Sequence, residues 1–176
     1  WLSVVALVIL AYYGLYLYNF RHDQLGGRRL PLMGACVVLL LCTAFVFTNN
    51  MTLMLRPEQW LPYFDNPGGW MLNLTEPTLV PRYLHMVIAA LAVGGLAVAL
   101  MADFQKKRGK LTQEVADERK EYGMRWFTRT TLLQLVIGPL FLITLPREVM
   151  LSFMGGAMLN TAMLLVGLAG VALVLY

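Results

Sequence analysis

The residues best suited to chemistry lie in one short stretch, residues 81–86, which reads PRYLHM at the start of the third apolar run. His85 is the only histidine in such a run, because His22 lies between Arg21 and Asp23. An ionisable side chain at membrane depth is costly to keep and is usually functional. The imidazole of His85 could coordinate haem iron, or it could donate to a backbone carbonyl of another helix.

A haem iron held by His85 needs a second axial ligand at similar depth, because one histidine supplies only one bond. Methionine thioethers can fill this role, although most of the 11 methionines are expected to pack between helices. Candidates near the same face end the second apolar run or begin the fifth: Met51, Met54, Met150, Met154 and Met158. We favour Met154. Arg82, one turn before His85, is expected to pair with a haem propionate or to extend towards lipid phosphate.

The elements that must position these residues follow from composition. Hydrophobic residues make up 59% of the 176 and charged residues only 14%. Each of five apolar runs approaches the roughly 20 residues that a helix needs to cross a bilayer. These runs are residues 2–18, 31–55, 82–101, 126–145 and 149–176. We therefore predict an all-α fold, a multi-pass transmembrane helix bundle with about five spanning helices, forming one domain over residues 1–176.

Basic residues between the runs predict the orientation, because Lys and Arg in short loops tend to stay cytoplasmic. The first and third loops hold most of them: Arg21, Arg28, Arg29, Lys106, Lys107, Arg108, Lys110, Arg119, Lys120 and Arg125. Residues 104–125 are then a cytoplasmic basic helical arm, with Thr112 as a helix cap. His85 is expected near the periplasmic side of a bacterial inner membrane. This topology also explains the net charge of +4, so no nucleic-acid partner is predicted.

The second loop, residues 56–81, is expected on the outer side and is rich in aromatic residues, with Trp60, Tyr63, Phe64 and Trp70. Such rings favour the headgroup zone, so the loop could be an aromatic belt against the bilayer. The alternative is a cover over a cofactor at His85, to which Trp60 and Trp70 would contribute.

Two common types of site are excluded because the sequence lacks their motifs. The sequence has no Cys-x-x-Cys-His, which excludes covalent c-type haem attachment, and Cys36 and Cys42 are predicted to be packing residues. It also lacks a glycine-rich phosphate loop. The first residue is Trp1 rather than Met, so we expect a processed chain or one that extends further upstream.

Residues 28–98 resemble subunit I of the cytochrome bd-type quinol oxidases. The specific parts are residues 48–51, TNNM, similar to that family's Asn-x-x-Met at a helix end, then an aromatic loop, then residues 82–87, RYLHMV. The last stretch is similar to the family's Arg-Phe-x-His-Thr motif. The resemblance implies that His85 is an axial ligand of a low-spin haem b near a quinol site. Residues 152–154, SFM, look like the start of the family's methionine-bearing helix, with a spacing that departs by two residues.

The chain also departs from that family. Residues 146–152 form a short turn where the family has a long quinol-binding loop, and residues 1–20 lack the glutamates that the family uses at its oxygen-reducing centre. We therefore expect an electron-transfer subunit of a quinol-linked oxidoreductase complex rather than a complete oxidase. It would hold haem b and pass electrons between a quinone or quinol and a cytochrome or other redox protein. Its other partners would be further membrane subunits and membrane lipid. The alternative is a haem-free membrane anchor or assembly subunit.

Overall fold

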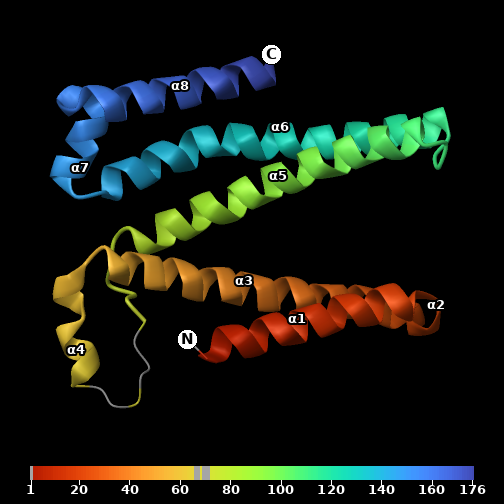
Figure 1. Ribbon diagram of the computed structural model, residues 1–176, viewed down its shortest axis with the longest axis horizontal. Helices are drawn as coiled ribbons and strands as arrows, with labels where there is room; N and C mark the ends of the chain where they lie inside the picture. Colours follow the sequence, from red (N-terminus) through yellow and green to blue (C-terminus); the bar gives the residue numbers. More distant parts are fainter. Residues whose placement is uncertain (1, 66–67, 69–71) are drawn as a thin grey trace. The chain divides into compact units, whose positions relative to one another are not determined.

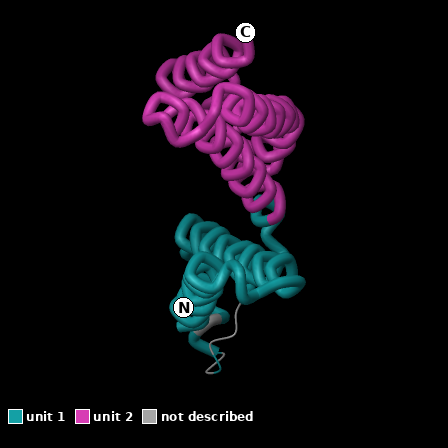
Figure 2. The backbone as a smooth tube through the Cα atoms, turned by 90° about the vertical axis from the view of Figure 1, so that its right-hand side faces the viewer, with its two compact units in different colours: residues 1–79 teal, residues 80–176 magenta. Residues whose placement is uncertain are grey.

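The computed structural model describes residues 2–65, 68 and 72–176, and every element of secondary structure within them is helical (Figure 1). The all-α prediction is therefore confirmed. The chain divides into two compact units, residues 1–79 and residues 80–176, drawn in different colours in Figure 2.

In the first unit, two long helices form an antiparallel hairpin: α1 (Leu2–Phe20) and α3 (Arg29–Met54). The turn between them consists of the short α2 (His22–Leu25) and η1 (Gly26–Arg28). Gly14 permits the close approach of the two helices, because a Cβ there would collide with the sulfur of Cys36. Cys36 is buried and Cys42 is exposed, so the packing prediction is confirmed for the first cysteine and not for the second.

The segment after α3 contains two short helical elements, η2 (Pro57–Gln59) and α4 (Leu61–Phe64). The indole Nε1 of Trp60 donates to the carbonyl oxygen of Leu53 at 2.7 Å. The same carbonyl accepts from the Arg56 N–H at 3.1 Å, so two groups of the loop bond to a carbonyl that the helix end leaves without an intrahelical partner. These bonds therefore tie the beginning of the loop to the end of α3.

The second unit is built on another antiparallel pair, α5 (Leu79–Lys107) and α6 (Gln113–Thr144). Gly109 ends α5 with a φ of 70°, and the Lys110 N–H bonds to the Gln105 carbonyl. This pattern is that of a Schellman cap. Thr112 then caps α6 by accepting a bond from the Val115 N–H, as predicted. Pro31 and Pro81 lie in the first turns of α3 and α5, where a missing N–H costs nothing.

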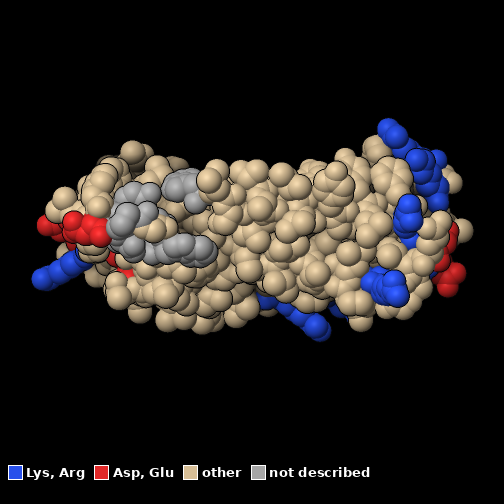
Figure 3. All heavy atoms as spheres, turned by 90° about the horizontal axis from the view of Figure 1, so that it is seen from below, with Lys and Arg blue, Asp and Glu red and all other residues tan. Residues whose placement is uncertain are grey.

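Among the described residues, five helical segments are long and apolar enough to cross a membrane: Leu2–Phe20, His22–Met54, Leu79–Lys107, Gln113–Thr144 and Met158–Leu175. The face drawn in Figure 3 is largely uncharged between groups of Lys, Arg, Asp and Glu. Large apolar side chains such as Ile9, Val38, Val93 and Val166 are at least half exposed in the described chain. Such surfaces are suited to contact with lipid, and the protein is a multi-pass membrane protein.

The fifth apolar run is not one continuous helix, and here the sequence prediction was wrong. The run consists of α7 (Arg147–Leu151), an irregular turn η3 (Ser152–Gly156) and the spanning helix α8 (Met158–Leu175). Gly155 has a φ of 108°, which side chains rarely allow. Hydrogen bonds link this irregular turn, the break between α7 and α8, to the first turn of α8. Asn160 donates to the Ser152 hydroxyl at 3.0 Å, and Thr161 accepts from the Gly155 N–H at 3.0 Å.

Candidate functional site

The closest approach of α5 and α6 in the described residues is at positions without bulky side chains. A Cβ at Gly95 would lie 2.7 Å from the Gly123 carbonyl oxygen, and one at Gly123 would lie 2.7 Å from the Ala99 nitrogen. Small residues allow two helix backbones to approach closely, as is common in membranes. The face of α5 that includes Ala92 and Ala99 is buried. The neighbouring helix α6 therefore occupies the part of this face around Ala99.

His85 lies on α5 at the other end of the same antiparallel pair. Its carbonyl oxygen accepts a 2.7 Å hydrogen bond from the amide Nε2 of Gln134 on α6. Its ring lies beside Phe141, with 5.9 Å between ring centroids and 28° between the planes. The ring nitrogen Nδ1 is buried and has no hydrogen-bond partner in the part of the chain that the structure describes. A buried polar atom in this state calls for a partner or a ligand.

Arg82 precedes His85 by one turn and reaches the same aromatic ring. Its guanidinium carbon is 5.0 Å from the centroid of Phe141, within the range of a cation–π contact. Phe141 thus lies beside both the cation and the imidazole. The structure brings together Arg82, His85, Gln134 and Phe141, and we call these four residues the His85 cluster. Sequence reasoning found the first two and missed the second two.

The sequence does contain a feature that could have identified Gln134 as part of the cluster. It is an uncharged amide in the middle of an otherwise apolar run, and such a side chain must find hydrogen-bond partners among other helices. Phe141 had no comparable signal, because one aromatic residue among many apolar residues looks like ordinary packing. Only its position opposite His85 makes it part of the cluster.

Met154, the favoured second ligand, lies in η3 with a backbone conformation outside the helical range. Its side chain is 66% exposed, whereas the Met158 side chain at the start of α8 is 91% exposed. Met154 is thus on an irregular turn rather than at the start of the spanning helix.

Replacing Gly155 by alanine tests how firmly this turn is fixed. We expect the variant to lose about 1–3 kcal/mol of unfolding free energy, because alanine at a φ of 108° is strained. Gly170→Ala in α8 is the matched control, since a Cβ there meets nothing within 4 Å and alanine favours helix. Denaturant titrations of both variants in detergent measure the difference. Equal stabilities would show that the break adopts another conformation.

The second group of buried polar residues belongs to the first unit, at the end of α3. The side-chain oxygen of Asn49 accepts from the Asn73 N–H at 2.7 Å, and these residues are only 2% and 5% exposed. The bond fixes the loop segment around Asn73, which leads back to α5, against the end of α3. Neither asparagine carries a charge, so the pair supplies order rather than acid or base chemistry.

Glu76 is a buried carboxylate just beyond this pair. It accepts from the Thr78 hydroxyl at 3.0 Å and pairs with Arg56 at 3.1 Å. Arg56 also donates to Glu58, on the exposed side of the loop. The pKa of Glu58 lies below its ordinary value, first because its own backbone N–H donates to the carboxylate and then because Arg56 does so. The described part of the loop is therefore held by hydrogen bonds and ion pairs, in addition to its aromatic rings.

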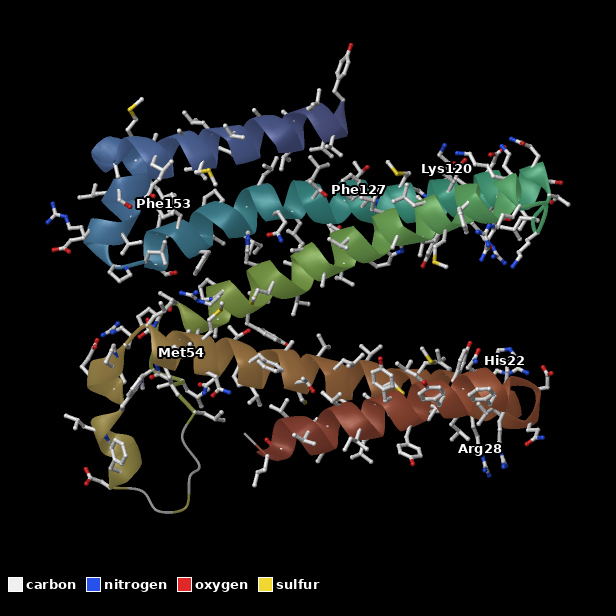
Figure 4. All side chains as sticks on the ribbon, in the orientation of Figure 1. His22, Arg28, Met54, Lys120, Phe127 and Phe153 are labelled. Atoms are coloured by element: carbon white, nitrogen blue, oxygen red, sulfur yellow. The ribbon has the colours of Figure 1, made fainter. Side chains whose placement is uncertain are left out.

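Of the two tryptophans proposed to cover a cofactor at His85, the structure describes only Trp60. Trp60 is 47% exposed and bonds to the end of α3, so its described contacts lie within the first unit. Trp70 lies outside the described residues. His22 lies in the turn between α1 and α3 (Figure 4), and its ring meets the ring of Tyr18 edge-on, with 5.1 Å between the centroids.

Comparisons with protein-family models, with curated proteins and with solved structures found no match to this chain. Residues of known function therefore cannot be transferred to it from a relative. The described residues also contain no group of three or more His, Cys, Asp or Glu that could hold a metal ion. A site that uses one imidazole, such as haem ligation, does not require such a group.

Proposed function

We propose that this protein is a membrane electron-transfer subunit that holds one haem b through His85. The observation that carries the proposal is the buried Nδ1 of His85, which has no partner in the described chain. An imidazole can take a metal ligand on one nitrogen and a hydrogen bond on the other. The resemblance of residues 82–87 to the histidine motif of cytochrome bd-type quinol oxidases supports the same role.

Other residues of the chain would hold the group and set its properties. Arg82 would donate to a propionate, and Phe141 would shield one side of the imidazole from water. Met154 is the proposed second ligand, and its location on a turn allows the thioether to be presented from outside a regular helix. When bound, the haem would supply one-electron chemistry, with a reduction potential raised by methionine ligation. Electrons would pass between quinone or quinol and a partner redox protein, on the periplasmic side of a bacterial inner membrane.

An optical spectrum of the purified protein tests this proposal. We expect a sharp b-type α band after dithionite reduction and one haem per chain by pyridine haemochrome. His85→Ala should lose both, and His22→Ala, the other histidine variant, should keep both. Single leucine variants at Met150, Met154 and Met158 would identify the second ligand by loss of the low-spin spectrum. A well-folded preparation of the wild-type chain without haem would overturn the proposal.

The second candidate function is a haem-free membrane anchor or assembly subunit. The observation that favours it is that the apolar window of α8 has 0% of its residues buried in the described structure. A spanning helix with no fully buried residues leaves most of its surface available to a larger membrane neighbour. This reading predicts no haem at any histidine, so the same spectrum separates the two candidates.

A further inference from the structure

Two buried side-chain atoms, one on His85 and one on Gln134, have no hydrogen-bond partner among the described residues, and they are chemically complementary. One is Nδ1 of His85, and the other is the amide oxygen Oε1 of Gln134. Gln134 is held beside His85 by its other amide atom, since Nε2 donates to the His85 carbonyl at 2.7 Å. This bond also fixes the amide orientation, because a flipped amide would set two oxygens against each other.

A neutral imidazole has one nitrogen with a hydrogen and one with a lone pair. Oε1 can only accept, so a hydrogen bond from Nδ1 to it, direct or through one water, requires that Nδ1 carry the hydrogen. The lone pair then lies on Nε2, which is the atom left to bind iron. A hydrogen bond to the second nitrogen generally orients a metal-binding histidine and raises its basicity.

We propose that Gln134 is a positioning residue that selects the Nδ1–H tautomer of His85, through a hydrogen bond made directly or through one water. This inference rests on the proposed haem function and names the residue that prepares the ligand for it. Gln134 does not touch the iron. It acts through His85, by holding the ring orientation and by keeping Nε2 unprotonated.

The tautomer can be measured without haem. In haem-free protein labelled with ¹⁵N-histidine, His22→Ala leaves His85 as the only signal. We expect a protonated Nδ1 and a bare Nε2 by NMR, and a loss of this preference in Gln134→Leu. Gln113→Leu is the control, because this exposed glutamine bonds to Asp117 near the start of the same helix. An Nε2–H tautomer in the parent protein would overturn the inference.

Haem binding supplies the second readout. Gln134→Leu should weaken haem affinity roughly 10- to 100-fold, as is typical when such a partner is removed. Gln134→Glu keeps an acceptor for Nδ1 but loses the donor to the His85 carbonyl, so it should also weaken haem binding. The haem that remains should have a lower reduction potential, because a carboxylate makes the imidazole more electron-donating. Circular dichroism checks that each variant is folded.

Failure of this inference is distinguishable from failure of the proposed function. If His85→Ala abolishes haem while Gln134→Leu leaves tautomer, affinity and potential unchanged, Gln134 has no positioning role and the haem proposal stands. If the wild-type protein binds no haem, the proposed function fails, and the NMR experiment still decides whether Gln134 controls the tautomer.

Discussion

Gly95→Ala is expected to destabilise the second unit by about 1–3 kcal/mol, the usual cost of forcing extra atoms into a packed interface. The added Cβ would lie 2.7 Å from both the Gly123 oxygen and the Phe127 nitrogen. These are backbone atoms, so the helices themselves must move apart. Because α5 and α6 also carry His85 and Gln134, the separation should lengthen the hydrogen bond between these residues.

The adjacent residue provides the control. A Cβ at Gly94 meets nothing within 4 Å, so Gly94→Ala should be neutral or stabilise the helix by about 0.5–1 kcal/mol. Unfolding in a denaturing detergent titration measures both variants. If the two alanines had the same effect, the close crossing of α5 and α6 would be refuted.

The second large effect is expected at Asn49. Asn49→Leu removes the acceptor of the buried Asn73 N–H, and a buried donor left without a partner costs about 1–3 kcal/mol. The expected result is a loss of this size in unfolding free energy. Amide hydrogen exchange at Asn73 should also become faster, because its N–H is no longer protected.

Asn50 is the matched control, since it is the next residue of α3 and only 9% exposed. Its Nδ2 is buried without a partner in the described chain. Asn50→Leu therefore removes an unsatisfied donor, and stability should stay the same or rise. A larger loss at Asn50 than at Asn49 would show that the hydrogen bond to Asn73 does not hold the loop.

The candidate site was partly visible in the sequence. His85 is conspicuous because an imidazole in an apolar run is rare, and Arg82 follows from its position one turn earlier. Gln134 and Phe141 lie 49 and 56 positions further on than His85, respectively. Their relation to it depends on how two helices cross, and no local pattern specifies that crossing.

The break before α8 shows the same limit at the level of one helix. Residues 149–176 are apolar almost throughout, so hydropathy alone reads them as one span. The Gly155-Gly156 pair was a local sign of a break, but glycine is also common within membrane helices. Its φ of 108° and the bonds among Ser152, Asn160 and Thr161 determine that the chain turns there.

The sequence by itself determined the class of this protein. Apolar runs of sufficient length must form helices in lipid, because each backbone polar group then bonds within its own segment. Only the tertiary structure decided which side chains meet. The close approach of Gly95 and Gly123 sets the register of α5 against α6, and that register places the Gln134 amide beside His85. The physical reason is that helix formation depends on local bonds and solvent, whereas register depends on the fit of two distant surfaces.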